Sequence, residues 1–173
     1  MQAQTAGMTN NDILRRIRYI FDYSDAQMIE IFALAGIKVR RGHVVSWLIN
    51  EDEPSYQRCD DKILASFLNG LITMKRGKKN GPQPEPEHSL TNNLILKKLR
   101  IALELQSGDV IAILKLAEFE LSASELSSFF RNPGHRNYRA CKDQVLRNFL
   151  KGLQINLRDE KKQRPASIWP SRD

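Results

Sequence analysis

Two matching polar segments, 50–61 and 132–143, hold the residues whose types could support chemistry. Each segment has a tyrosine, a cysteine and an aspartate at the same spacing; these six residues are Tyr56, Cys59, Asp61, Tyr138, Cys141 and Asp143. A tetrahedral zinc site needs four ligands, yet only His135 lies near a cysteine and there is no C-x-x-C pair. Free cysteine is among the most often buried residue types. We therefore interpret the repeated residues as structural anchors and expect no metal and no cofactor.

Catalytic motifs are absent from the sequence. It contains no phosphate-binding P-loop, no H-E-x-x-H, no G-x-S-x-G and no dinucleotide fingerprint. The three histidines, His43, His88 and His135, lie in unrelated contexts, and no pairing of a nucleophile with a base is evident. We expect no catalytic residue and interpret the protein as a non-enzyme.

Basic residues are the stronger candidates for a binding site. The residues before the anchors are acidic in one segment (Glu51, Asp52 and Glu53) and basic in the other (His135, Arg136 and Arg139). Cations that flank an aromatic ring are typical of sites that bind phosphates and stack on bases. The candidate contact residues for an anion or nucleic acid are Lys75, Arg76, Lys78, Lys79, Arg136, Tyr138, Arg139, Lys161, Lys162 and Arg164.

The two segments belong to two copies of one longer unit. Residues 9–71 align with residues 91–153 without a gap, and 20 of the 63 positions are identical. A repeat of this length indicates two copies of one supersecondary unit. A chain of this size buries only about 60% of its unfolded surface when it folds alone. We therefore expect the copies to pack on each other.

Each copy predicts four helices and no strand. Apolar residues recur at helical spacing in four stretches of each copy, and polar breaks separate the stretches. Thr9-Asn10-Asn11, Ser24 to Gln27 and Ser122 to Glu125 supply the cap residues with which helices begin. The sequence thus predicts an all-α fold, a tandem duplication of a four-helix unit with the two copies packed on each other.

Two glycines and two arginines also recur at equivalent positions. Gly70 and Gly152 lie inside the last predicted helix, where glycine costs about 1 kcal/mol relative to alanine. We expect each to allow close approach of a neighbouring helix, with the fourth helix of the other copy as the candidate. The recurring arginines lie beside the apolar stripe of the first helix, and we predict that they tie it to the fourth. The predicted pairs are Arg18 with Asp61 and Arg100 with Asp143.

The sequence outside the two copies is polar and basic. Residues 72–90 begin with a basic stretch and continue with Pro82-Gln83-Pro84-Glu85-Pro86, which favours an extended spacer. The apolar pattern fades after residue 153, so 154–173 is predicted to be a flexible basic tail. The net charge of +7 divides into −1 for 9–71, +2 for 72–90, +4 for 91–153 and +2 for 154–173. The excess therefore lies in the second copy, the linker and the tail.

Composition is that of a globular protein, with 41% hydrophobic and 27% charged residues. No apolar run reaches the roughly 18–20 residues that cross a membrane. Residues 1–8 lack the basic and apolar regions of a secretion signal. We expect a cytoplasmic location, where the two cysteines stay reduced.

Several motifs resemble the YehS-like family of small bacterial proteins, which carry a domain of unknown function in two copies. The resemblance covers roughly residues 10–153 and rests on Asn11-Asp12-Ile13-Leu14-Arg15, on Phe67-Leu68-Asn69-Gly70-Leu71, on the segment 93–102 and on the segment 134–141. It implies a bacterial, cytoplasmic, helical protein and brings no activity or site residues. The stretch Arg40-Arg41-Gly42-His43 departs from the acidic cap more common in the family, which affects only the start of the third helix.

These observations favour a non-enzymatic binding module. Its basic second copy, linker and tail would contact nucleic acid or another acidic macromolecule, and such binding weakens steeply with salt. The alternative is a module for protein–protein interaction or self-assembly into a homo-oligomer, in which the oppositely charged segments pair. A third interpretation is that the basic excess only keeps the protein soluble.

Overall fold

The computed structural model describes residues 7–159, which form eight α-helices and one π-helical turn. The first repeat contains α1 (Asn10–Phe21), α2 (Asp25–Leu34), α3 (Arg41–Leu48) and α4 (Asp61–Arg76). The second contains α5 (Asn92–Ala102), α6 (Ser107–Leu116), α7 (Ala123–Phe129) and α8 (Asp143–Gln154), which continues into the turn η1 (Ile155–Asp159). No strand occurs within 7–159, and the predicted all-α duplication is confirmed.

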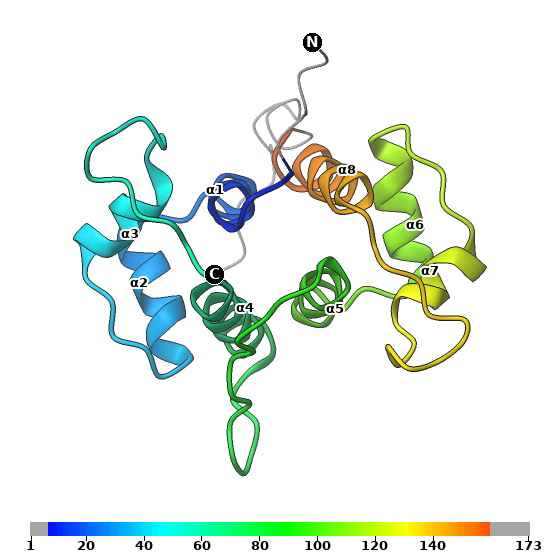
Figure 1. Cartoon of the computed structure of the whole chain (residues 1–173), viewed down its shortest axis with the longest axis horizontal. Coiled ribbons are helices and arrows are strands. Elements are labelled where there is room, and N and C mark those ends of the chain that lie inside the picture. Colours follow the sequence, from blue (N-terminus) through cyan, green and yellow to red (C-terminus); the bar gives the residue numbers. More distant parts are fainter. Residues whose placement is uncertain (1–6, 160–173) are drawn as a thin grey trace, which may run out of the picture.

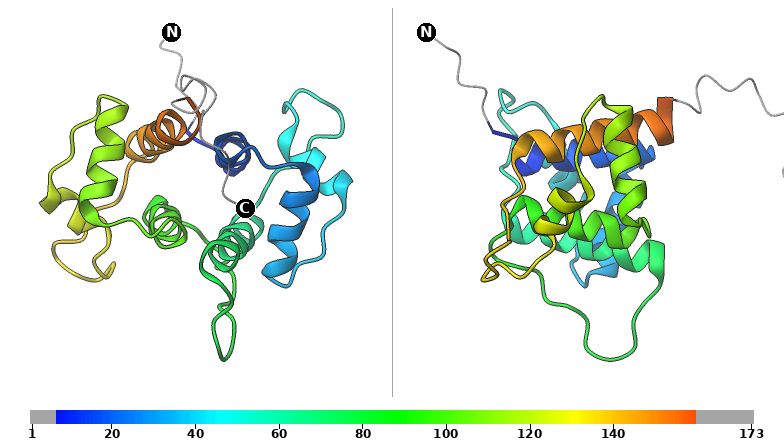
Figure 2. Two further views of the ribbon diagram at one scale, coloured as in Figure 1. Left: turned by 180° about the vertical axis from the view of Figure 1, so that it is seen from behind. Right: turned by 90° about the vertical axis from the view of Figure 1, so that its right-hand side faces the viewer.

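Four helices, α1, α4, α5 and α8, form the centre of the molecule (Figure 1). Helix α1 packs on α8 and α4 packs on α5, so both of these contacts join one repeat to the other. Helices α2 and α3 cover one side of the centre, and α6 and α7 cover the other (Figures 1 and 2). An approximate twofold axis parallel to the central helices therefore relates the two repeats.

The apolar face of each first helix fills the core of its repeat. In α1 this face consists of Ile13, Leu14, Ile17 and Ile20, which are all at most 4% exposed and recur at helical spacing. An aromatic cluster joins α2, α3 and α4, because the ring of Phe32 lies 5.4 Å from that of Trp47 and 5.3 Å from that of Phe67. The equivalent residues of the second repeat are also buried; they are Ile95, Leu96, Leu99, Ala102, Leu114, Phe129 and Phe149.

All four central helices run in the same direction. At their N-terminal end, the Asn10 side chain of α1 donates to Asp61 Oδ1 at the start of α4, at 2.7 Å. The backbone N–H of Leu90, just before α5, donates to the other oxygen of Asp61 at 2.9 Å. The twofold-related bonds join Asn92 and the backbone N–H of Met8 to Asp143, at 2.6 and 3.3 Å. Each aspartate therefore joins the starts of three helices from both repeats.

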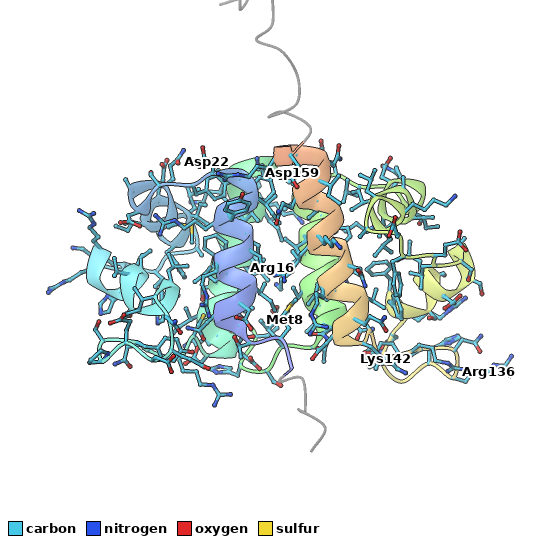
Figure 3. The ribbon with its side chains drawn as sticks, turned by 90° about the horizontal axis from the view of Figure 1, so that it is seen from above. Met8, Arg16, Asp22, Arg136, Lys142 and Asp159 are labelled. Carbon is cyan, nitrogen blue, oxygen red and sulfur yellow. The ribbon has the colours of Figure 1, made fainter. Side chains whose placement is uncertain are left out.

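The opposite end of the centre is held by two ion pairs between the repeats. Arg76, in the last turn of α4, pairs with Glu104 just after α5. Arg158 of η1 lies 3.4 Å from Asp22, which follows α1. Figure 3 shows this end for α1 and α8, with Asp22 and Asp159 at one end of the pair and Met8 and Lys142 at the other. The repeats are thus fastened at both ends of their interface.

The predicted pairing of Arg18 with Asp61 is wrong. Arg18 Nη2 lies 2.8 Å from Asp25 Oδ1, and its Nε donates to the Tyr23 carbonyl at 3.1 Å. The predicted pairing of Arg100 with Asp143 is wrong for the same reason: Arg100 donates to the carbonyl of Leu105 and the hydroxyl of Ser107. Each arginine therefore closes the connection between the first and second helices, because its helical position points it away from the start of the fourth.

Gly70 and Gly152 make the close helix contact that the sequence predicts, but with a different helix. A Cβ atom at Gly70 would lie 1.9 Å from the carbonyl oxygen of Ile31 in α2, and one at Gly152 would lie 2.0 Å from that of Ile113 in α6. The partner is thus the second helix of the same repeat. The expected contact between the two fourth helices is wrong because α4 and α8 lie diagonally across the centre (Figure 1).

Candidate anion-binding site

Paired asparagines at the start of the first helix hold the recurring cysteine and aspartate in place. Asn11 is fully buried; its side chain donates to the carbonyls of Trp47 and Gln57 and accepts from the N–H of Cys59, at 3.0, 2.9 and 3.0 Å. The same bonds recur in the second repeat, where Asn93 donates to Phe129 and Arg139 and accepts from Cys141. The sequence pattern assigns these asparagines to helix capping alone and misses this second task.

The chemistry of the anchors follows from burial and hydrogen bonds. Burial raises the pKa of Cys59 and of Cys141 to about 12, so both remain thiols near neutral pH. Hydrogen bonds from Asn10 and from the N–H of Leu90 hold the pKa of Asp61 below its usual value. Tyr56 and Tyr138 are half-buried. Within the described part of the chain, no cluster of three or more His, Cys, Asp and Glu side chains could hold a metal ion.

The basic residues that the sequence proposes as contacts do not share one surface. Lys75 and Arg76 belong to the last turn of α4, which runs five residues past the predicted end of the repeat at residue 71. Lys75 Nζ lies 4.9 Å from the centre of the Phe21 ring, and Arg76 pairs with Glu104. Lys78 and Lys79 are exposed in the linker that follows.

The other predicted contacts lie far from these. Arg136, Tyr138 and Arg139 belong to the α7–α8 loop at the outer edge of the second repeat, near the N-terminal end of α8 (Figure 3). Arg139 donates within its own loop, to the carbonyls of Arg136 and Tyr138. Lys161, Lys162 and Arg164 lie outside the described residues.

A different set of cations meets where the two repeats join. A surface cavity of ≈ 330 Å³ between α1 and α8 is lined by Met8, Asp12, Arg15, Arg16 and Arg147. We call this surface the α1–α8 groove. Figure 3 looks onto it, with Arg16 between the two helices. The groove combines arginines from both repeats, so it exists only in the duplicated fold.

Most of the positive charge along the α1–α8 groove is not neutralised within the protein. Arg15 pairs with Asp12 at 3.1 Å. No carboxylate of residues 7–159 forms an ion pair with Arg16 or Arg147. The same is true of Lys151, which lies one helical turn after Arg147 on the same face of α8. Arg16 and Arg147 therefore line the groove without a carboxylate partner in the described range, and Lys151 extends this row of cations along α8.

An aromatic contact continues the groove toward its other end. The guanidinium of Arg158 lies 3.8 Å from the centre of the Tyr19 ring, and the Tyr19 side chain is 42% exposed. Tyr19 lies about one turn after Arg15 and Arg16 on α1. The repeat alignment contains a signal for the two arginines of α1: Arg15 and Arg16 match Lys97 and Lys98, so the positive charge is kept in both copies.

The twofold-related surface lies between α4 and α5. Lys97 and Lys98 take the places of Arg15 and Arg16 there, but the linker crosses this side of the molecule (Figure 2). Glu87 of the linker lies 3.0 Å from Lys98 Nζ and neutralises it. No described segment crosses the α1–α8 groove in the same way, because the linker joins only α4 to α5. The two grooves are therefore equivalent in backbone and different in charge.

Fold and groove together define a helical protein built from a duplicated unit whose repeats meet along a basic surface. The chain belongs to the DUF1456 family of proteins of unknown function, and the family model matches it twice, at residues 10–77 and 92–159. This confirms the resemblance inferred from the sequence motifs.

A relative of the chain is the uncharacterized protein YehS of Escherichia coli strain K12, which is 46% identical over 147 residues. The match covers 84% of the chain and 94% of the relative. No solved structure matches the chain. Among the described helices, none is long and apolar enough to cross a membrane.

Proposed function

We propose that this protein is a binding module that holds a strand of nucleic acid along the α1–α8 groove. The observation that carries the proposal is the set of three cations along the groove, Arg16, Arg147 and Lys151, that have no carboxylate partner among residues 7–159. Arginine suits this task because its planar guanidinium donates two parallel hydrogen bonds to a phosphate.

The dimensions of the groove fit a nucleic acid strand. Helix α1 has 12 residues and is therefore about 18 Å long. Phosphates of one strand follow each other every 3.4 Å or so along a helical axis, so α1 spans about five of them. The proposed nucleic-acid interface lies at the junction of the repeats, whereas the sequence alone predicts it in the second copy, the linker and the tail.

The test measures binding of fluorescently labelled RNA and DNA oligonucleotides across a salt series. The variant Arg16→Ala/Arg147→Ala/Lys151→Ala should weaken binding and reduce the slope of log K against log salt by about 2, since each contact with a single strand contributes about 0.7. A matched control is Lys38→Ala/Arg40→Ala/Lys115→Ala, which removes the same charge from exposed positions on the outer helices and their connections and should keep the slope.

Three results would contradict the proposal. One is the absence of binding at low salt. Another is an equal loss of affinity in the groove variant and in the control variant. The third is equally tight binding of polyglutamate, which would assign the groove to acidic proteins instead.

A second candidate function is head-to-tail self-assembly. The acidic residues Glu51, Asp52 and Glu53 and the basic residues Arg136 and Arg139 are exposed in loops on opposite sides of the molecule (Figure 1). A contact between two unlike surfaces adds one copy of the protein after another in an open chain, unless the rotation between successive copies closes a ring. Mass determination in solution tests this function: oligomers that dissociate with salt support it, and a monomer at all salt concentrations rejects it.

A further inference from the structure

The side of the molecule that carries the linker holds a second cavity. A cleft of ≈ 570 Å³ lies between α4, the linker and α5, which we call the linker cleft. Its volume lies within the range of roughly 300–1,000 Å³ in which proteins bind small molecules. In Figure 2 the linker stands away from α4 and α5 as an arch. Its proline residues favour a stiff, extended chain, which helps to keep the cleft open.

The inner part of the linker cleft is polar and buried. The Lys98 side chain is 11% exposed, and its Nζ donates to Asn69 Oδ1 at 2.5 Å and lies 3.0 Å from Glu87 Oε1. Asn69 itself is 6% exposed. Two further atoms of this cluster, Asn69 Nδ2 and Glu87 Oε2, are buried without a hydrogen-bond partner in the described structure. A buried group without a partner costs about 1–3 kcal/mol. One donor and one acceptor without a partner therefore belong to two residues that line the cleft.

The walls of the linker cleft are apolar, unlike its inner part. Leu94 and Ile101 of α5 line the helical side, and Pro82 and Pro84 line the linker side. Ile101 is 40% exposed, so part of this apolar wall faces solvent. The arrangement provides apolar surface on both sides of the space between helix and linker.

Two cations at the rim are available for an anion. Lys79 and Lys97 are exposed, line the cleft, and form no ion pair with the carboxylates of residues 7–159. Arg76 also lines the cleft but is paired with Glu104. The local charge is thus positive where the cleft opens.

The repeat fold does not require these features, because the equivalent positions of the other groove differ. Asn69 corresponds to Lys151, Leu94 to Asp12 and Ile101 to Tyr19. A structural need of the four-helix unit would recur in both copies, as the buried asparagines and glycines do. The apolar wall and the buried amide belong only to the side that the linker covers.

We propose that the linker cleft binds a nucleotide. The base would lie between the prolines and the α5 side chains. The Asn69 and Glu87 side chains, whose unpartnered atoms are covered in the free protein, would turn to meet the acceptor and donor that nucleobases carry side by side. Lys79 and Lys97 would hold the phosphate. An aliphatic anion would leave the Asn69 and Glu87 atoms unpaired, and inorganic phosphate would leave the apolar walls unused.

Isothermal titration calorimetry of the full chain tests the proposal with five kinds of probe. These are the four nucleoside 5′-monophosphates, the nucleosides, inorganic phosphate, octanoate and buffer alone. We expect at least one nucleotide to bind at least tenfold more tightly than its nucleoside and than inorganic phosphate. The variant Lys79→Ala/Lys97→Ala should weaken that nucleotide at least tenfold and leave the weak binding of its nucleoside unchanged.

Two variants distinguish binding in the linker cleft from binding in the α1–α8 groove and from effects on folding. Ile101→Trp places a larger side chain at an exposed position of the wall, where it should block the nucleotide without unfolding the protein; thermal unfolding checks this. Arg15→Ala/Arg16→Ala is the matched control, since it removes two cations from the other groove, one of which (Arg15) is equivalent to Lys97. It should affect oligonucleotides and spare the mononucleotide, so failure of one proposal is distinguishable from failure of the other.

The proposal is overturned by any of the following outcomes. Nucleotides do not bind, octanoate binds more tightly than they do, or phosphate alone binds as tightly. An equal loss of nucleotide affinity in Arg15→Ala/Arg16→Ala and in Lys79→Ala/Lys97→Ala would also overturn it, since the site would then not be the linker cleft.

Discussion

Replacing Gly70 by alanine should destabilise the protein even though alanine favours helices. The added Cβ would lie 1.9 Å from the carbonyl oxygen of Ile31 and 3.1 Å from its Cγ2. Close contacts between carbon and a carbonyl oxygen begin at about 3.3 Å, so α2 and α4 would have to separate by roughly 1.4 Å. The obstacle is backbone, which no change of rotamer can move aside.

The size of the effect follows from two opposing contributions. Forcing extra atoms into a packed core costs up to about 3 kcal/mol. Replacing a helical glycine by alanine returns about 1 kcal/mol of helix propensity. The expected net loss is therefore about 2 kcal/mol in the free energy of unfolding. In a chain of this length that loss corresponds to a decrease in Tm of about 4–8 °C.

Urea unfolding followed by circular dichroism measures this difference, with two matched substitutions as controls. Gly42 in α3 and Gly108 in α6 have no atom within 4 Å of the place where a Cβ would lie, so Gly42→Ala and Gly108→Ala should stabilise by about 0.4–1 kcal/mol. Gly152→Ala should behave like Gly70→Ala, because its Cβ would lie 2.0 Å from the Ile113 carbonyl oxygen. A Gly70→Ala protein as stable as wild type or more stable would refute the reasoning.

Three further predictions concern the anchors and the asparagines that hold them. Asn11→Ala or Asn93→Ala should cost about 3 kcal/mol or more, since each removes three hydrogen bonds with backbone groups that are buried or partly buried; a loss below about 1 kcal/mol in urea unfolding would contradict this. Asp61 has a lowered pKa in the folded state. Its contribution to the free energy of unfolding is therefore present above the unfolded pKa of about 3.9 and is lost as the pH falls through the pKa of the folded state. Asp61→Asn should therefore flatten the decrease in stability below about pH 4, and parallel profiles for the two proteins would count against the assignment. Cys59 and Cys141 should resist iodoacetamide at about pH 8 in the native protein and react in urea, because burial raises both pKa values to about 12; rapid native labelling, measured by mass spectrometry, would show the thiols to be accessible.

The sequence predicts the helices and the duplication because both depend on local signals. Apolar spacing and cap residues such as Ser24 and Ser122 mark where helices begin. The packing of the copies depends on long-range contacts that spacing does not encode. For that reason Arg18 is assigned the wrong partner, and the partner of Gly70 is placed in the wrong repeat.

The candidate site is harder to predict than the fold for a similar reason. Clusters of charge along the chain, such as Lys78 and Lys79, are visible in the sequence but do not share a surface with the α7–α8 loop. Arg16 and Arg147 are more than a hundred residues apart in sequence and meet only because α1 packs on α8. A site at a junction between repeats leaves no contiguous motif.

The twofold relation between the repeats has a consequence for how the interface is maintained. Asp61 of the first repeat accepts from the N–H before the first helix of the second repeat, and Asp143 of the second repeat accepts from the N–H before the first helix of the first. The same reciprocal contacts occur in the self-complementary interface of a symmetric dimer. The linker turns this association into an intramolecular one, so the two halves meet at an effective concentration that its length and stiffness set. Pairing of the two halves is thereby independent of how much protein the cell contains. Either copy can then change its surface charge without losing its partner. The linker cleft and the α1–α8 groove, which are equivalent in backbone, differ in charge in this way.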